Sequence, residues 1–180
     1  MTQPNSRPKR AVFSRRYYQN FKEIREDFRY ISGHRDLIRK TMRETISFDF
    51  RERLMMVVTQ VNGCRYCASF HAKEALKSGI SNEELKVLLA GDIPEDAPVE
   101  EVPALAYAQH WAESDAQPDE AAVQRLVDEY GSEKANAIGM VLRMIRMGNL
   151  SGNLLDYWLY KLSFGRLGAT EKDEDFVVLK

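Results

Sequence analysis

The sequence predicts an all-α fold, a single-domain multi-helix bundle of about eight helices. Apolar residues recur at spacings of three and four along most of the 180 residues, and almost no segment alternates with the period of a strand. Glycines and prolines separate these periodic segments where helices usually end and begin. A hydrophobic content of 44% with 29% charged residues is typical of one globular domain.

The first expected helix has an apolar face that needs a covering surface. Five apolar side chains follow one another at spacings of four, three, four and three, which places them on one side of a helix. They are Tyr17, Phe21, Ile24, Phe28 and Ile31.

The formal net charge of −1 conceals two regions of opposite sign. Residues 1–43 carry twelve Lys and Arg against four Asp and Glu, whereas residues 81–130 carry two against thirteen. We expect the basic segment to dock on the acidic middle of its own or a neighbouring subunit. The alternative is contact with nucleic-acid phosphates, and we favour the first interpretation because the basic residues share their segment with a regular apolar stripe.

The later helices are bounded by recognisable caps. Asp49 is the expected cap of a helix that ends at Asn62–Gly63, and Ser81 with Glu84 forms a capping-box pattern. The expected helices after the first span residues 49–62, 64–79, 81–91, 103–112, 118–131, 132–147 and 151–164. Asn149 and Asn153 follow a glycine near the last of these starts, where Asn commonly caps a helix. Methionines at helical spacing (Met55, Met56, Met140, Met144 and Met147) are expected in the core, with an apolar pocket or an oligomer interface as the alternative.

We expect one domain with three parts. Residues 1–43 form the basic arm and its amphipathic helix, residues 44–166 the core, and residues 167–180 a tail. The longest aliphatic and Met run, Leu54–Val58, is far shorter than the ~20 residues of a membrane span, and residues 1–10 do not resemble an export signal. These observations predict a cytoplasmic protein with no membrane partner.

The two cysteines stand in a pattern that indicates thiol chemistry. Cys64 and Cys67 are three positions apart at an expected helix start, where unpaired N–H groups and the helix dipole favour a thiolate. His71 follows Cys67 by one turn, roughly 6 Å along the axis, so it serves Cys67 better than Cys64. Glu52 lies twelve residues before Cys64, and an antiparallel hairpin that turns at Gly63 would bring its carboxylate beside His71.

Three other interpretations compete with this one. A structural disulfide is disfavoured in a chain without an export signal. A closed zinc site needs a fourth ligand beside Cys64, Cys67 and His71, so we expect no metal. Glu52 lies between two arginines, and its place in the sequence also fits an ordinary solvated side chain.

A loose internal echo also appears at an offset of 85 residues. It aligns the positions of Cys64, Cys67 and His71 with Asn149, Gly152 and Asp156. Chance similarity between two amphipathic helix pairs explains this echo nearly as well as a duplication does.

The motif Glu52-x11-Cys64-x2-Cys67-x3-His71 resembles that of the alkylhydroperoxidase D-like proteins of the carboxymuconolactone decarboxylase superfamily. The resemblance extends over roughly Phe48 to Asn153. It implies an all-α homo-oligomer, commonly a trimer or hexamer, that reduces hydroperoxides or passes electrons from a dithiol such as dihydrolipoamide to a peroxiredoxin. No cofactor is implied.

The resemblance also assigns roles by position. Cys67 corresponds to the thiol that attacks the peroxide, Cys64 to its resolving partner, His71 to the base and Glu52 to the carboxylate of the relay. Tyr66 is a departure, because the best-studied peroxidases of this family carry a second His there. The decarboxylase branch generally lacks the Cys pair, so decarboxylation is disfavoured.

Overall fold

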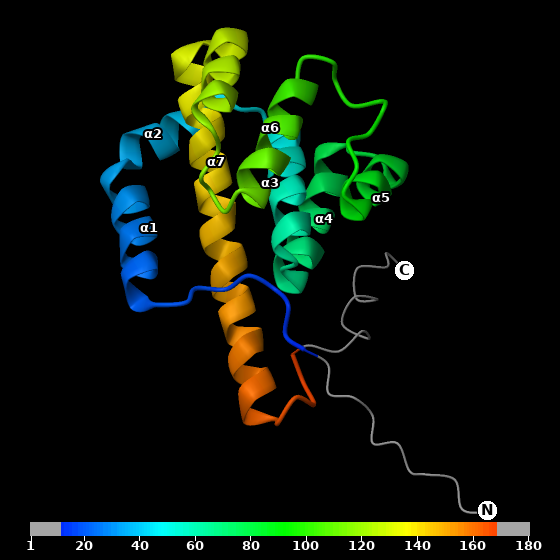
Figure 1. The fold of residues 1–180 in the computed structure, drawn as a ribbon. Coiled ribbons are helices and arrows are strands. Elements are labelled where there is room, and N and C mark those ends of the chain that lie inside the picture. The colour runs from blue at the N-terminus through cyan, green and yellow to red at the C-terminus, as the bar shows by residue number, and fades with distance from the viewer. Residues whose placement is uncertain (1–11, 169–180) are drawn as a thin grey trace, which may run out of the picture.

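The computed structural model describes residues 12–168, and within them every regular element is helical (Figure 1). The all-α prediction is therefore confirmed. Residues 1–11 and 169–180, which include the start of the basic arm and nearly all of the expected tail, lie outside the described residues. In chain order the elements are α1 (Phe21–Gly33), α2 (Arg35–Lys40), the π-helical turn η1 (Thr41–Thr45), α3 (Phe48–Asn62), α4 (Arg65–Ser78), α5 (Asn82–Ala90), α6 (Val102–Glu113) and α7 (Glu120–Leu162).

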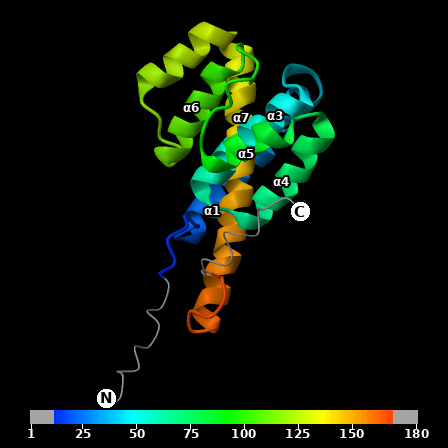
Figure 2. The ribbon, with the colours of Figure 1, turned by 90° about the vertical axis from the view of Figure 1, so that its right-hand side faces the viewer.

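Helix α3 is the centre of the bundle. It packs against α4, α5, α6 and α7, while α1 and α2 lie on the opposite side of the long helix α7 from α4 and α5 (Figures 1 and 2). The uninterrupted apolar run Leu54–Val58 explains this position, because a helix that is apolar on every side is stable only when neighbours surround it. The surrounding helices keep this entire run buried.

Most helix ends agree with those predicted from the sequence, but some capping residues differ. Ser47, not Asp49, caps α3, and its hydroxyl accepts from the N–H of Phe50. Gly63 ends α3 in the left-handed conformation at φ 68°, a position that glycine occupies without steric cost. Ser81 caps α5 as predicted, but the side chain of Glu84 points away from the cap and binds Arg53 instead.

Helix α7 corrects the expectation of a break between residues 147 and 151. Its backbone leaves helical geometry at Gly131 (φ 73°, ψ 159°), as predicted, and then stays helical to Leu162. The first segment of α7 starts at Glu120 after an Asp119 cap, not at Pro118. Asn149 and Asn153 are fully buried within the helix and do not cap it, because their amides bind groups at the end of α3.

The apolar stripe of α1 is only partly covered by the described part of the chain, because Ile24 and Ile31 are half-buried where α1 packs on α7. The helix begins at Phe21 after an Asn20 cap, so Tyr17 lies outside it. Phe21 is 76% exposed and Phe28 62% exposed, and α1 has no buried residue.

Among residues 12–168, no helix combines the length and hydropathy that crossing a bilayer requires.

A buried charge cluster joins α3 to α5 and to the start of α6. Arg53 donates to Glu84 at 2.5 Å, to Asp49 at 2.9 Å and to Glu101 at 3.2 Å. One guanidinium therefore faces three carboxylates, and burial of Glu101 raises its pKa to about 7.

We predict that Glu101 makes folding stability fall with pH between about 4.5 and 7. Its pKa is higher in the folded chain than its ordinary value of 4.5, so its contribution is full below 4.5 and is lost as the pH rises toward 7. Denaturant unfolding of the wild type and Glu101→Gln across this range measures the difference directly. The wild type should lose stability relative to the variant, whereas a pH-independent difference would contradict the prediction.

Candidate functional site

The hairpin of α3 and α4 brings Glu52 and His71 together. His71 Nδ1 lies 2.7 Å from Glu52 Oε2, although the residues are nineteen positions apart. An ionised carboxylate only accepts hydrogen bonds, so with Glu52 ionised the proton sits on Nδ1, and a neutral imidazole keeps Nε2 as its basic atom. The two side chains thus have the geometry of an oriented base.

Burial of Glu52 excludes the interpretation that it is a solvated residue. It is 3% exposed, and its second carboxylate oxygen lies 3.8 Å from Nε of Arg51. Arg51 is itself held by Met42 and by the ring of Phe48. A buried carboxylate is stable only with such partners, so Arg51 and His71 together account for the position of Glu52.

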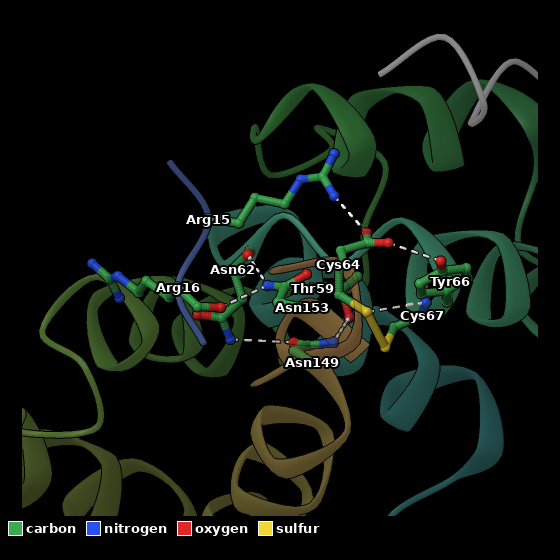
Figure 3. Close-up of a disulfide and its surroundings, with 10 residues drawn as sticks. Arg15, Arg16, Thr59, Asn62, Cys64, Tyr66, Cys67, Asn149 and Asn153 are labelled. Carbon is green, nitrogen blue, oxygen red and sulfur yellow. Dashed lines mark hydrogen bonds and ion pairs between the residues drawn. A yellow bond between two sulfur atoms is a disulfide. The ribbon is translucent and has the colours of Figure 1, made fainter. Parts of the chain in front are cut away.

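The two cysteines form a disulfide at the start of α4, with Cα atoms 5.4 Å apart (Figure 3). Cys64 is the N-cap residue of α4, and its sulfur accepts from the N–H of Cys67 at 3.3 Å. Cys64 is 1% exposed and Cys67 is half-buried. The helix start therefore places one sulfur where backbone N–H groups stabilise negative charge.

Cys67 and His71 share an apolar cavity of about 380 Å³. The cavity is lined by Met55, Tyr66, Cys67, Phe70, His71, Met144, Ile145 and Gly148. Met55, Met56 and Met140 are buried as the core prediction requires, but Met55 and Met144 also line this cavity, so both interpretations of the methionines hold in part. The cavity can hold a small apolar molecule beside the sulfur of Cys67.

Cys64 lines a different cavity, of about 550 Å³, between the N-terminal segment and the end of α3. Arg15, Arg16 and Arg65 are among its lining residues. The disulfide therefore lies between two spaces of different polarity.

The buried carboxylate of Asp156 was not predicted from the sequence as part of the site. It accepts from Arg15 at 2.7 Å and from the hydroxyl of Tyr66 at 2.8 Å (Figure 3). It also accepts from Arg65 at 2.7 Å. Burial raises the pKa of Tyr66, and its hydroxyl donates to Asp156. Tyr66 thus joins the start of α4 to α7, at the position where the peroxidases that the sequence resembles carry a second His.

The loose internal sequence similarity at an offset of 85 residues already pointed to this part of α7. Asn149, Gly152 and Asp156, its second-copy positions, lie close to the start of α4. Asn149 accepts from Asn62 at 3.2 Å and donates to Thr59 at 3.1 Å. A Cβ atom on Gly152 would lie only 2.9 Å from the sulfur of Cys64.

The described part of the basic N-terminal segment contacts the end of α6 and helix α7. Arg16 donates to the carbonyl oxygens of Ala112 and Glu113 at the end of α6, within the acidic middle of the chain. Its own carbonyl accepts from Asn153. The contact with the acidic middle is therefore made here through backbone carbonyls.

The described residues contain no group of three or more His, Cys, Asp or Glu side chains arranged to hold a metal ion. His34 stacks on Tyr30, and His110 pairs with Asp119 at 3.0 Å, so each has a different local partner. A zinc site of Cys64, Cys67 and His71 thus gains no fourth ligand within residues 12–168.

The fold and site define a class of all-α proteins in which a helical hairpin holds a Cys pair beside a Glu–His pair. The carboxymuconolactone decarboxylase family model matches residues 28–114, from α1 to the end of α6. The match contains Glu52, Cys64, Cys67 and His71 and confirms the superfamily recognised in the sequence.

The comparisons with individual proteins are more distant. The chain is 27% identical over 116 residues to the uncharacterized protein YdfG of Bacillus subtilis (strain 168), an alignment covering 63% of this chain and 78% of the relative. No solved structure matches the chain significantly.

We predict that Gly152→Ala destabilises the oxidised protein by about 1–3 kcal/mol, because the new methyl group overlaps the disulfide. Gly139→Ala is the matched control on the same helix, since a Cβ there meets nothing within 4 Å. Alanine at that helical position should be neutral or stabilising. Equal unfolding midpoints for the two variants in denaturant would show that the disulfide does not need the close approach at Gly152.

Proposed function

We propose that this chain is a thiol-dependent hydroperoxide reductase. The observation that carries the proposal is the Glu52–His71 hydrogen bond beside a cavity that both His71 and Cys67 line. The carboxymuconolactone decarboxylase family includes decarboxylases and alkyl hydroperoxidases. The Cys64–Cys67 pair favours the second activity, because two thiols supply the two electrons that reduction of a peroxide consumes and become a disulfide.

In the reduced protein, Nε2 of His71 accepts the proton of the Cys67 thiol, and Glu52 stabilises the imidazolium. The Cys67 thiolate attacks one oxygen of the hydroperoxide; the S–O bond forms, the O–O bond breaks, and the alkoxide leaves as an alcohol with a proton from His71. Cys67 is then a sulfenic acid.

Cys64 completes the oxidation. Its thiolate, at the N-cap of α4, attacks the sulfur of the Cys67 sulfenic acid; the S–S bond forms, the S–O bond breaks, and the hydroxide takes up the proton released by the Cys64 thiol and leaves as water. A thiol or dithiol reductant returns both cysteines to the reduced state by exchange. The oxidised form that this cycle produces has the same Cys64–Cys67 bond as the structure.

We also propose that the protein acts as a homo-oligomer, such as a trimer or hexamer. Large apolar side chains are exposed on α1 and toward the end of α7, namely Phe21, Phe28, Leu155, Trp158 and Leu162. Apolar surfaces of this kind mark association sites in folded proteins.

We predict that Cys67→Ser abolishes hydroperoxide consumption, because it removes the attacking sulfur. Cys64→Ser should stop turnover but still form a sulfenic acid once, since only the resolving step is lost. Mass spectrometry after addition of hydroperoxide and a sulfenic-acid trap distinguishes the two variants. A trapped sulfenic acid in Cys67→Ser, or undiminished turnover there, would contradict the assignment.

We predict that Glu52→Gln slows oxidation of Cys67 by at least about tenfold, because the imidazolium loses its carboxylate. Glu84→Gln is the control, since it also removes a buried carboxylate from an arginine partner but lies in the Arg53 cluster. Stopped-flow measurement of the rate of Cys67 oxidation from pH 5 to 9 distinguishes a role of Glu52 in positioning His71 from a general loss of stability. Equal dependence of this rate on pH in the two variants would contradict a role for Glu52 in the relay.

A further inference from the structure

Two methionine side chains form part of the wall of the apolar cavity beside Cys67. Met55 and Met144 line this cavity together with Cys67 and His71. Met55 is only 6% exposed, whereas Met144, on α7, is half-buried. A small molecule that enters the cavity therefore meets a thioether as well as the sulfur of Cys67.

The disulfide leaves Met144 as the accessible nucleophilic sulfur in this cavity. The structure has Cys64 and Cys67 bonded to each other, and the cavity of about 380 Å³ is present in this oxidised form. In the reduced protein a thiolate at Cys67 reacts with a peroxide before a thioether does, because a thiolate is the stronger nucleophile. Once the disulfide has formed, a further hydroperoxide in the cavity meets Met144 instead.

The cavity, not exposure, distinguishes Met144 from the other described methionines. Met56 and Met140 are almost fully buried. Met42 and Met147 are half-buried like Met144, but neither is part of the wall of this cavity. Met147 lies on the same helix and so provides an internal comparison of matched exposure.

We propose that Met144 is a sulfoxidation site, oxidised by an organic hydroperoxide that enters this cavity while Cys64 and Cys67 form the disulfide. The modification requires only that the cavity admits the hydroperoxide. Its effect on turnover rests on the redox function proposed above.

The oxidation balances between the two reactants. The thioether sulfur attacks the terminal oxygen of the hydroperoxide; the S–O bond forms and the O–O bond breaks. The proton of that oxygen passes to the alkoxide, which leaves as an alcohol, and Met144 becomes a sulfoxide. The sulfur loses the two electrons that the peroxide gains.

The sulfoxide places a polar oxygen in a wall made mainly of apolar side chains. The hydroxyl of Tyr66 in this wall already donates to Asp156, and Nε2 of a neutral His71 is an acceptor. The new oxygen therefore draws water into the cavity and weakens the binding of an apolar hydroperoxide. Thiol exchange does not reverse the change, whereas methionine sulfoxide reductases do, so the site acts as a reversible brake.

The test follows methionine oxidation after the disulfide has been formed with diamide, so the result does not depend on peroxidase activity. Excess cumene hydroperoxide is added, and peptide mapping by mass spectrometry gives the rates of sulfoxide formation at Met144, Met147 and Met42. Hydrogen peroxide is the second oxidant, because it lacks an apolar group. The alcohol 2-phenyl-2-propanol, the product of cumene hydroperoxide, is the unreactive competitor.

Cumene hydroperoxide should oxidise Met144 at least about fivefold faster than Met147, because burial of its apolar group holds it in the cavity. With hydrogen peroxide this ratio should fall to about twofold or less. The competitor should slow oxidation of Met144 and not that of Met147. Equal rates at the two methionines with cumene hydroperoxide, or no protection by the alcohol, would overturn the proposal.

Gly148 allows a variant that fills the cavity. It is part of the cavity wall, and a Cβ there meets nothing within 4 Å, so a leucine is tolerated in the helix and can occupy the open space. Gly148→Leu should slow oxidation of Met144 at least about threefold and leave Met42 unchanged. Gly139→Leu is the control, at an equally open position of α7 outside this cavity. An unchanged rate at Met144 in Gly148→Leu would contradict access through the cavity.

The effect on turnover is measured after reduction with dithiothreitol, which restores the thiols and leaves the sulfoxide. Stopped-flow oxidation of Cys67 by cumene hydroperoxide should then be at least about threefold slower than before treatment. Met144→Leu, which keeps an apolar side chain of similar volume, should retain its full rate after the same treatment. Equal losses in the wild type and Met144→Leu would contradict the brake. Absence of Cys67 oxidation before treatment would contradict the redox function and with it the brake, whereas sulfoxide mapping alone decides the site at Met144.

Discussion

The hydrogen bond between Glu52 and His71 is the constraint on which the site depends. It joins adjacent antiparallel helices inside the bundle, where an unpaired carboxylate would be costly, so it fixes the register of α3 against α4. That register places Cys64 at the start of α4 and Cys67 beside the cavity that His71 lines. The same contact leaves one imidazole nitrogen free to act as a base. Structural support and proposed chemistry therefore use the same two side chains.

Helix α7 supports the hairpin from the other side with polar groups that a core helix seldom carries. Asn149 and Asn153 satisfy groups at the end of α3, and Asp156 holds Arg65 and Tyr66 next to the cysteines. Gly152 provides the space that the sulfur of Cys64 occupies. Each of these interactions forms across helices far apart in sequence. The consequence is a disulfide held between the apolar cavity that Cys67 lines and the more polar cavity that Cys64 lines.

The sequence predicted the features that local spacing determines. The all-α class, the turn at Gly63, the break at Gly131 and the approach of Glu52 to His71 follow from helical periodicity and hairpin geometry. It did not predict that α7 continues past Gly148, because a glycine–asparagine pair favours a helix boundary unless tertiary contacts hold it. Nor did it reveal Asp156 or the Arg53 cluster, since a charged residue on a helix is normally solvated and only packing shows otherwise. The roles of Cys67, Cys64, His71 and Glu52 in catalysis stay predictions.

The most direct test of the account is a thiol titration of the reduced protein before and after one equivalent of an organic hydroperoxide. We expect two titratable thiols per chain before the addition and none after it, with the Cys64–Cys67 disulfide recovered by peptide mapping. His71→Ala, which removes the base but neither sulfur, should reach the same end point much more slowly. Two thiols still titratable in the wild type after prolonged exposure would contradict the claim that this hairpin is a peroxide-reducing centre.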